Sequence, residues 1–326
     1  MPSPLASLVV LNWNGANLLP DCIESLRRLA YSPVEIIIVD NGSTDHSADT
    51  FESVPGITVI KTGSNLGFAA GMNMGFRVAR GQYVAALNND ITVSENWLND
   101  AIDFMEKETG VGIISCRQMN YFKRNVIDSL YSYLHPSLIF FQEGFRSLYV
   151  PESSHARPAL VLGVSGASTL YRRQLLDEMH GFNESFGSYH EESDLCMRAF
   201  LAGWKCVYIP SAVTYHRRSA SFSNLKGTMF YLQTRNRLWF IYKYSPIRVM
   251  LANIGWILFT EMRILRVVIF REFVFLSYCK GMRDGFSGML RLRVSRQENM
   301  KKLKSRYKEY NELRKKKALA FDGNST

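Results

Sequence analysis

The stretch Gly81-Gln82-Tyr83-Val84-Ala85-Ala86-Leu87-Asn88-Asn89-Asp90 decides the class of fold, because a short apolar run ends abruptly in three polar side chains. In an open α/β sheet, ligands bind beyond the carboxyl ends of the parallel strands. Carboxylate and carbonyl oxygens bind Mg²⁺ together with substrate phosphates. We therefore expect Asp90 to be a metal ligand; an Asn/Asp turn that leaves a buried strand is the plain alternative for this stretch taken alone.

Strand-like apolar runs alternate with helical patterns on both sides of this stretch. The runs that predict strands are 7–11, 35–40, 57–61, 83–87, 111–115, 161–171 and 207–215. Apolar side chains recur at helical spacing in residues 18–29, directly behind the first run. This alternation predicts an α/β fold with a mostly parallel sheet and right-handed crossovers.

Two stretches depart from the regular pattern. Residues 121–149 are irregular and rich in Tyr and Phe, so they either line an apolar acceptor groove or pack locally as a long insertion. The predicted strand 161–171 is rich in small residues, which would let a neighbour such as a ligand approach its backbone closely.

An acidic cluster opens a predicted helix after a glycine-containing segment that begins at Gly181. Glu191 and Glu192 would lie in the first helical turn, where acidic residues also complement the helix dipole without any other role. Asp194 and Arg198 have the spacing of an i,i+4 ion pair.

Composition indicates a cytosolic chain with an ample core. Its 326 residues allow one large α/β domain with an appendage or two smaller domains, and 47% of them are hydrophobic. The five cysteines are odd in number and lack the CxxC spacing of metal sites, which predicts scattered thiols in a reducing compartment. The start of the chain lacks the basic segment of a signal peptide.

The net charge of +10 is concentrated near the C-terminus. Residues 280–317 contain 14 Lys and Arg but only four acidic residues, so the rest of the chain is neutral overall. A localised basic segment indicates an anionic partner at that place, either membrane phospholipid or nucleic acid.

The sequence predicts a boundary between residues 1–245 and a C-terminal extension, 246–326. Residues 249–260 are uncharged, but this run is well short of the roughly 20 residues that a membrane-spanning helix needs. We expect it to lie in the membrane interface, where Lys and Arg attract anionic lipid by about 1 kcal/mol each; a helix packed on the first domain is the alternative. We expect residues 300–317 to form a solvated basic helix or tail and residues 321–326 to be disordered.

Five motifs in this order resemble glycosyltransferase family 2, especially its bacterial rhamnosyltransferase-like branch. They are Leu11-Asn12-Trp13-Asn14, Val39-Asp40-Asn41-Gly42-Ser43-Thr44-Asp45, Asn65-Leu66-Gly67-Phe68-Ala69-Ala70-Gly71-Met72-Asn73, Leu87-Asn88-Asn89-Asp90 and Glu191-Glu192-Ser193-Asp194-Leu195-Cys196-Met197-Arg198. The resemblance covers about residues 5–245. It implies a GT-A fold with a Rossmann-like sheet, a nucleotide-sugar donor, a divalent cation (Mg²⁺ or Mn²⁺) and inversion at the anomeric carbon.

The resemblance also assigns residues to the donor. Asp40 matches the carboxylate that reads the imide N–H of uracil or thymine, and Trp13 is placed to stack on that ring. This implies a dTDP-sugar or UDP-sugar donor, with dTDP-rhamnose favoured. Asn65 and Gly67 resemble the loop along the nucleotide, and Arg235 resembles a residue that meets the leaving diphosphate.

The family's DxD motif corresponds to Asn88-Asn89-Asp90, so Asp90 would hold the cation on the diphosphate while Asn88 faces the ribose and Asn89 joins the same site. His216, which follows the last predicted strand, matches a family histidine near the metal. Asn88 replaces the first Asp of the motif, a departure that implies weaker metal affinity.

The chemistry implied by the resemblance requires a base opposite the leaving group. The cation neutralises the negative charge that develops on the diphosphate, and a carboxylate takes the proton of the attacking hydroxyl. In the family this base is the Asp of a Glu-Asp pair, and it aligns with Glu192. Because a misplacement of about 1 Å can reduce the rate about 10²-fold, Glu191 and Asp194 stay as reserve candidates.

These features predict a peripheral or monotopic enzyme at the cytoplasmic face of the inner membrane, which acts on a saccharide acceptor, lipid-linked, in cell-surface polysaccharide or O-antigen synthesis. Three alternatives stay open. A nucleotidyltransferase would need a Gly-rich phosphate loop directly after the first strand, which residues 12–17 do not supply. Nucleic-acid binding would leave Asp40, Asp90 and Glu192 without a role, so we expect no nucleic-acid partner. The third is a catalytically inactive membrane scaffold, because two motif positions depart from the family pattern.

Overall fold

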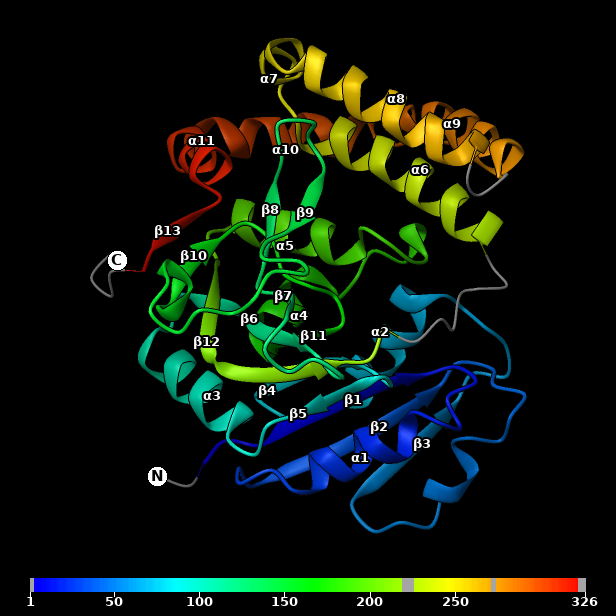
Figure 1. Cartoon of the computed structure of the whole chain (residues 1–326), viewed down its shortest axis with the longest axis vertical. Coiled ribbons are helices and arrows are strands. Elements are labelled where there is room, and N and C mark those ends of the chain that lie inside the picture. Colours follow the sequence, from blue (N-terminus) through cyan, green and yellow to red (C-terminus); the bar gives the residue numbers. More distant parts are fainter. Residues whose placement is uncertain (1–2, 219–225, 271–273, 322–326) are drawn as a thin grey trace.

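A computed structural model of the chain describes residues 3–218, 226–270 and 274–321 (Figure 1). Its strands are β1 (Ala6–Asn12), β2 (Val34–Asp40), β3 (Ile57–Lys61), β4 (Tyr83–Asn88), β5 (Ile91–Val93), β6 (Val111–Asn120), β7 (Ile127–Ser129), β8 (Ser132–Leu134), β9 (Phe140–Gln142), β10 (Ala159–Val161), β11 (Ser168–Arg172), β12 (Lys205–His216) and β13 (Ala318–Ala320). Its α-helices are α1 (Leu19–Arg27), α2 (Phe68–Val78), α3 (Trp97–Lys107), α4 (Arg173–Met179), α5 (Glu191–Ala202), α6 (Lys226–Tyr244), α7 (Ile247–Ala252), α8 (Ile254–Phe270), α9 (Phe275–Met289), α10 (Arg293–Ser305) and α11 (Tyr307–Lys316).

The main sheet has the order β13-β10-β12-β6-β11-β4-β1-β2-β3, with β5 on β12 and β7 on β6. Strands β4, β1, β2 and β3 run parallel to one another, and β6 and β12 form a second parallel pair. Strand β11 lies between the two groups and is antiparallel to both β4 and β6. The sheet is therefore mixed and mostly parallel, as the alternation of strands and helices predicted.

Helices cover both faces of this sheet. Helices α1 and α3 pack on one face with the apolar sides that their spacing predicted, and α2, α4 and α5 pack on the other. Gly75 lets α2 lie close to the sheet, because a Cβ atom there would be 2.2 Å from Val9 Cγ1.

The predicted strand 161–171 is wrong as a single element. The structure divides it into β10 and β11, joined by a loop at 162–167. The small residues accommodate protein neighbours: a Cβ atom on Gly163 would be 2.7 Å from the ring of Phe140, and one on Gly166 would be 3.5 Å from Glu192 Cγ.

The aromatic insertion forms β7 and the hairpin β8–β9, which rises from the sheet to the C-terminal helices (Figure 1). On one side of the hairpin, Leu134 and Phe140 belong to the core shared with Phe240 of α6. On the other side, the rings of Tyr133 and Phe141 lie 6.4 Å apart and are partly exposed. One side of the hairpin is therefore local packing.

The extension after residue 245 returns to the first domain, although it begins as a separate layer of helices. Residues 300–317 form the predicted basic helix, as parts of α10 and α11, but not a detached tail, because Leu303, Tyr310 and Leu313 are buried against α5 and α6. Strand β13 adds to the edge of the main sheet at β10. Phe321 packs on Phe104 with ring centroids 5.1 Å apart instead of being disordered, and residues 322–326 lie outside the described residues.

Candidate active site

The ends of β1 and β2 meet at a polar hub centred on Asn12. Its side-chain amide donates to Ser47 Oγ at 2.8 Å and lies 3.4 Å from Asp40 Oδ1, while its oxygen accepts a hydrogen bond from Asn89 Nδ2 at 2.8 Å. Gly15 must lack a side chain, because a Cβ atom there would be 2.2 Å from Asn12 Oδ1. Asn89 therefore joins the end of β4 to the end of β1, and its contact with the nucleotide sugar stays a prediction.

Asp40 lies at the end of β2 and is buried. It accepts hydrogen bonds from the hydroxyl and the backbone N–H of Ser43. Trp13 is half-buried in the loop that follows β1, next to the register pair Asn12 and Asp40. The structure thus brings Asp40 and Trp13 to the same edge of the sheet.

The segment before α2 is held by an amide network that the sequence did not single out. Asn41 donates to Asn65 Oδ1 at 3.2 Å and to the carbonyl of Gly67 at 3.1 Å, and it accepts from the N–H of Leu66 at 3.0 Å. Gly67 has φ +82°, a conformation that favours glycine. Asn65 and Gly67 are therefore fixed beside the β2 end that carries Asp40.

The loop before α5 caps the start of α2. The carbonyl of Gly187 accepts from Ala69 N at 2.8 Å, and Ser188 Oγ accepts from Phe68 N at 3.0 Å. Arg235 donates to the carbonyls of Ser185 and Phe186, so it positions this loop, and its contacts give no support to the predicted meeting with a diphosphate.

Asn236 completes the support of the loop. Its side-chain nitrogen donates to the carbonyls of Phe186, Ser188 and Tyr189 at 2.7–2.9 Å. Tyr189 and His190 both have positive φ, +69° and +70°, immediately before the acidic cluster. Backbone strain of this kind persists where surrounding contacts enforce it, and it clusters at functional sites.

Asp90 and His216 meet although they are far apart in the sequence. His216 Nε2 lies 3.3 Å from Asp90 Oδ1, and both side chains are largely buried. The connection is built by β5, which pairs with the last residues of β12, and by Arg217 N, which donates to the carbonyl of Asp90 at 3.1 Å. The structure thus brings the two predicted metal ligands side by side.

Asp128 of β7 is a site residue that sequence reasoning missed. Its Oδ2 lies 2.7 Å from His216 Nδ1, and its Oδ1 pairs with Arg218 Nε. Burial alone would lower the pKa of His216, but the hydrogen bonds with Asp128 and Asp90 outweigh this effect and raise its pKa to about 9. Asp128 lies in a three-residue strand within the irregular insertion, where no periodic pattern marks it.

One loop connects the metal-ligand side to the acidic cluster. The carbonyl of Ala167 accepts from Asn88 N at 3.0 Å, two residues before Asp90. Gly166, the preceding residue, lies against the side chain of Glu192. The loop 162–167 therefore borders both groups, and Glu192 and Asp90 belong to one region at the carboxyl edge of the sheet.

The two glutamates at the start of α5 form an interacting pair. Burial and the charge of Glu192 raise the pKa of Glu191 well above its usual range. Burial also raises the pKa of Glu192, although hydrogen bonds, including one from Glu191, act in the opposite direction. Glu192 is partly exposed whereas Glu191 is buried, so Glu192 is the carboxyl group that a ligand can reach more easily.

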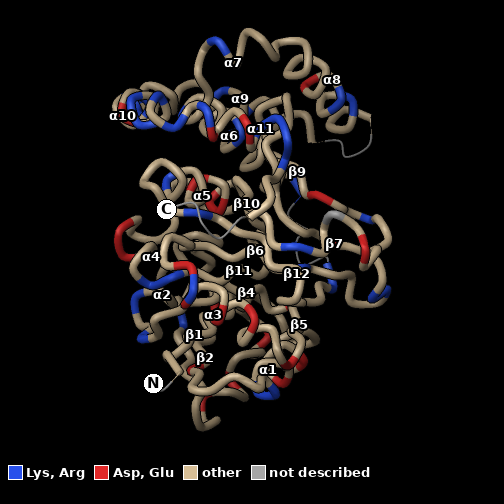
Figure 2. Tube along the Cα trace, turned by 90° about the vertical axis from the view of Figure 1, so that its left-hand side faces the viewer, with Lys and Arg blue, Asp and Glu red and all other residues tan. Residues whose placement is uncertain are grey.

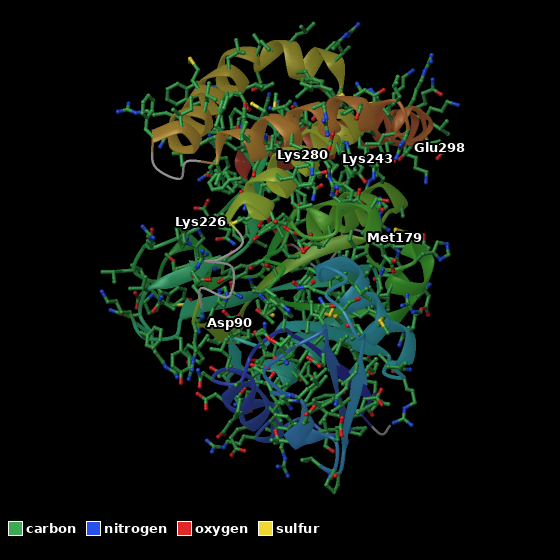
Figure 3. All side chains as sticks on the ribbon, turned by 90° about the vertical axis from the view of Figure 1, so that its right-hand side faces the viewer. Asp90, Met179, Lys226, Lys243, Lys280 and Glu298 are labelled. Carbon is green, nitrogen blue, oxygen red and sulfur yellow. The ribbon has the colours of Figure 1, made fainter. Side chains whose placement is uncertain are left out.

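Asp194 is committed to a buried ion-pair network. Its carboxylate contacts Lys243 Nζ, Arg198 Nε at 2.8 Å and the hydroxyl of Tyr244 at 2.8 Å. Burial alone would raise the pKa of Asp194, but Lys243 and Arg198 hold it below its usual range. Asp90 lies below the Lys226 end of α6, whereas Lys243 lies toward the other end (Figure 3). Asp194 is thus a structural residue, and its place as a reserve base is not supported.

The Asp90–His216 pair fits a divalent cation. A carboxylate oxygen and an imidazole nitrogen are both ligands of Mn²⁺, and Mg²⁺-type sites commonly use one or two protein ligands with waters and substrate phosphates. Within the described residues no cluster of three or more His, Cys, Asp or Glu is arranged as a metal site, so the donor's diphosphate would have to supply further ligands.

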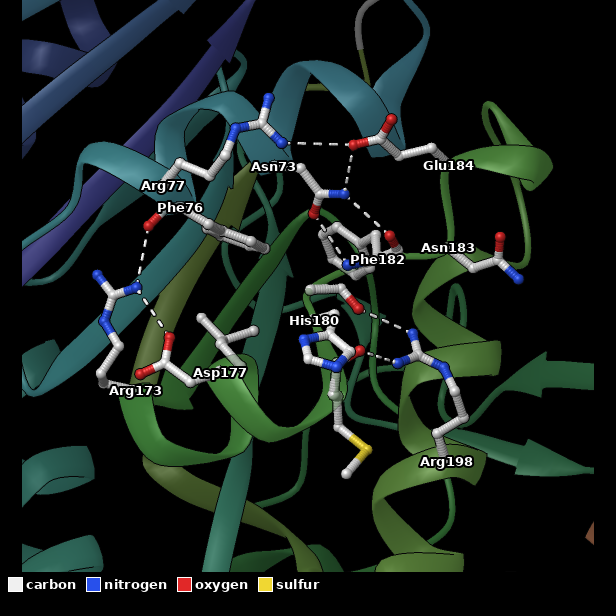
Figure 4. Close-up of a pocket in the computed structure, with 13 residues that line it drawn as sticks. Asn73, Phe76, Arg77, Arg173, Asp177, His180, Phe182, Asn183, Glu184 and Arg198 are labelled. Atoms are coloured by element: carbon white, nitrogen blue, oxygen red, sulfur yellow. Dashed lines mark hydrogen bonds and ion pairs between the residues drawn. The ribbon is translucent and has the colours of Figure 1, made fainter.

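A cavity of about 790 Å³ lies elsewhere, among α2, α4 and the residues after α4 (Figure 4). Arg77 pairs with Glu184 and Arg173 with Asp177 at its rim. Arg198, which pairs with Asp194, also lines the cavity and donates to the carbonyls of Met179 and Gly181. None of the predicted site residues lines it.

Comparison with known proteins identifies relatives of this chain. The model of glycosyl transferase family 2 matches residues 7–179, which include Asp40 and Asp90 but end before Glu192. The chain is 23% identical over 266 residues to the N-acetylglucosaminyl-diphospho-decaprenol L-rhamnosyltransferase of Mycobacterium tuberculosis, covering 71% of this chain and 85% of the relative. It is 28% identical over 238 residues to an uncharacterised protein of Sinorhizobium fredii, covering 67% of this chain but only 25% of that relative.

Solved structures support the fold. S. aureus TarS in complex with UDP-GlcNAc matches with a TM-score of 0.60 and 15% identity, over 94% of this chain and 91% of that one. The mannosyltransferase PcManGT from Pyrobaculum calidifontis, in complex with GDP-Man and Mn²⁺, matches with a TM-score of 0.55 and 14% identity, over 88% and 87%. These likenesses confirm the predicted GT-A fold.

Proposed function

The chain belongs to glycosyltransferase family 2, and from this we propose that it transfers a sugar from a pyrimidine nucleotide-diphosphate donor, dTDP-rhamnose favoured, to a saccharide acceptor. One observation carries the proposal: the loop 162–167 contacts the residue before the Asn89-Asp90 pair on one side and Glu192 on the other. The proposed cation ligand Asp90 and the proton-accepting carboxylate of Glu192 therefore border one region. The family match gives no support to the nucleotidyltransferase alternative.

Each residue has a role in the proposed reaction. Asp40 and Trp13 would bind the base, and Asn65 and Gly67 would lie along the nucleotide. Asp90 and His216 would hold Mg²⁺ or Mn²⁺, which as a Lewis acid stabilises the negative charge of the leaving diphosphate. Glu192 would take the proton of the acceptor hydroxyl as that oxygen attacks the anomeric carbon, on the side opposite the leaving group, so that the product has inverted configuration.

Nucleotide binding tests the donor assignment. Thermal unfolding would be followed with UDP, dTDP, GDP and CDP, each with and without Mn²⁺. Ligand at a hundred times its Kd stabilises the folded state by about 2.7 kcal/mol. We expect UDP or dTDP to stabilise the chain more with Mn²⁺ than without it, and Asp40→Ala to remove the preference. Selective stabilisation by GDP would contradict the role of Asp40.

The surface of α7–α9 supports a membrane location. Helix α8 directs Glu261 inward, where it pairs with Arg237 at 2.8 Å, and exposes apolar side chains: Trp256, Leu258, Phe259, Met262 and Phe270. Helix α9 adds Leu276, which is 84% exposed. In a helix of a water-soluble domain the apolar side chains face the core, whereas in α8 many of them face outward. Large exposed apolar patches mark interaction surfaces.

We propose that this face lies in the interface of an anionic membrane at the cytoplasmic side, where a lipid-linked acceptor would be presented. No helix within the described ranges is long and apolar enough to cross a bilayer. Arg263 and Arg266 lie on the same exposed helix, and Figure 2 shows further Lys and Arg along α10. Basic side chains among apolar ones suit anionic headgroups.

Point substitutions test this location better than truncation, because removing the extension would also remove β13 and buried residues of the core. We expect Trp256→Glu with Phe259→Glu to reduce co-sedimentation with anionic phospholipid vesicles at least about tenfold. Val78→Glu, at a similarly exposed position on α2, should leave it unchanged. Unchanged vesicle binding by the double variant would contradict the proposal. So would a wild type that does not bind vesicles but forms a dimer, if the double variant is monomeric.

A further inference from the structure

Asp128 occupies a position whose function the family match leaves open. It is 2% exposed, and its two carboxylate oxygens have different partners, His216 Nδ1 at 2.7 Å and Arg218 Nε. Strand β7 holds it by antiparallel pairing with β6, in which Ser129 is opposite Gln118. The carboxylate is therefore fixed by the backbone beside the end of β12.

The contact with Asp128 decides how the imidazole of His216 is presented. A carboxylate beside Nδ1 favours a proton on that nitrogen, which leaves Nε2 as the nitrogen with a lone pair when the ring is neutral. Nε2 is the atom that lies 3.3 Å from Asp90 Oδ1. If the ring turned over, a carbon atom would face Asp90 and the bond to Asp128 would be lost.

We propose that Asp128 is a positioning residue, which sets the tautomer and orientation of His216 so that Nε2 faces the cation and diphosphate beside Asp90. The inference rests on the proposed function. Carboxylate partners of this kind orient histidine ligands, and their loss typically weakens metal binding about 10–100-fold.

A purely structural role would give a different result. Asp128 also neutralises Arg218, which donates to Gln142 at 2.7 Å and so ties the end of β12 to the hairpin. If that were its whole role, Asp128→Ala would lower the melting temperature without a specific effect on metal affinity. The two readings therefore differ in Mn²⁺ binding and in its dependence on His216.

The experiment is a titration of the full chain with Mn²⁺, followed by the loss of the free Mn²⁺ electron paramagnetic resonance signal, at saturating UDP and again at saturating dTDP. The proteins are the wild type, Asp128→Ala, Asp128→Asn, His216→Ala and the double variant Asp128→Ala/His216→Ala. Glu261→Gln is the matched control, since it breaks an ion pair in α8 far from this site in the chain.

We expect Asp128→Ala to weaken Mn²⁺ binding about 10–100-fold and Asp128→Asn, which keeps an acceptor oxygen, to weaken it less. In the His216→Ala background, Asp128→Ala should change the affinity by no more than about threefold, because the ring that it orients is gone. Glu261→Gln should bind Mn²⁺ like the wild type. If Asp128→Ala does not fold, Asp128→Asn alone and with His216→Ala provides the same comparison.

Wild-type affinity in Asp128→Ala, or an equal loss with and without His216, would overturn the positioning role and leave the proposed function intact. Failure of the wild type to bind Mn²⁺ with either nucleotide would overturn the metal part of the proposed function, and this inference with it.

Discussion

Replacing Glu192 with Gln should reduce the rate of sugar transfer sharply without destabilising the fold. The substitution keeps the size of the side chain and removes its ability to take a proton. Loss of a general base reduces the rate about 10²–10⁴-fold. Burial raises the pKa of Glu192 in the folded chain, so its ionisation near neutral pH opposes folding. An uncharged Gln avoids this penalty, and we expect a melting temperature equal to or above that of the wild type.

Asp194→Asn should give the opposite pattern. Asp194 is fully buried and pairs with Lys243, which is 3% exposed. Removing one partner of a buried ion pair typically destabilises a protein by 3–5 kcal/mol. With an unfolding entropy of about 2.1 cal/mol/K per residue, this corresponds to roughly 4–7 °C for a chain of 326 residues. Below that melting temperature, the rate should stay within about tenfold of the wild type, because the proton acceptor is intact.

The assay combines two measurements on both variants. Donor turnover is followed as release of the nucleoside diphosphate with Mn²⁺, and stability is followed by thermal unfolding at the same pH. The variants should separate, one losing rate and the other losing stability. If Glu192→Gln retained wild-type turnover while Asp194→Asn lost it at full stability, the assignment of the base would be refuted.

Three further predictions concern the support of the site. Gly285→Leu should destabilise the chain by about 1–3 kcal/mol, because a Cβ atom there would already lie 2.6 Å from Leu238 of α6, whereas Gly255→Ala, with open space around it, should be neutral or stabilising in thermal unfolding. Burial and the charge of Arg237 lower the pKa of His190 to about 4. As the pH falls from about 6.5 to 4, the imidazole is therefore protonated in the unfolded chain but not in the folded one, and the free energy of unfolding should fall. His190→Asn, which suits the positive φ, should show a smaller fall in denaturant titrations over this pH range. Asn236→Ala should lower kcat by a larger factor than it lowers the affinity for the nucleotide, because it removes the hydrogen bonds to three carbonyls of the loop before α5. Both are measured at a temperature where the variant is folded. An unchanged kcat would argue against a role of that loop.

The sequence predicted the parts of the site that lie at the ends of regular strands. Asp40 and Asp90 follow β-branched or apolar runs, and parallel strands end at one edge of a sheet, so their proximity could be inferred before the structure was known. The fold class and the family are confirmed. Glu192 was predicted as the base from its place in a motif, and only the structure shows that burial raises its pKa.

The residues that were missed act through contacts that leave no periodic signal. Asp128 comes from a three-residue strand in an irregular insertion, and Asn12 and Asn41 are ordinary amides until the strand ends bring them together. The sequence marked Asp194 as a reserve base and could not show that Lys243, on a distant helix, pairs with this carboxylate.

The C-terminal extension also could not be predicted fully from the sequence. Its basic composition predicted a solvated basic helix or tail. Helices form, but the buried side chains of Leu303, Tyr310 and Leu313 anchor α10 and α11 on the core, and β13 joins the sheet. Spacing within one helix does not reveal which neighbour it meets. The apolar run in α8 was recognised, yet only the structure shows that Glu261 faces inward to pair with Arg237.

The central claim is that separate strand ends place a cation-bound diphosphate and a proton-accepting carboxylate around one sugar carbon. A crystal structure of the chain with Mn²⁺ and UDP or dTDP tests this claim most directly. We expect the anomalous signal of Mn²⁺ within bonding distance of both Asp90 and His216 Nε2, with the β-phosphate beside it and the carboxylate of Glu192 facing the same cleft. A cation bound away from Asp90, or a Glu192 turned out of that cleft, would contradict the account.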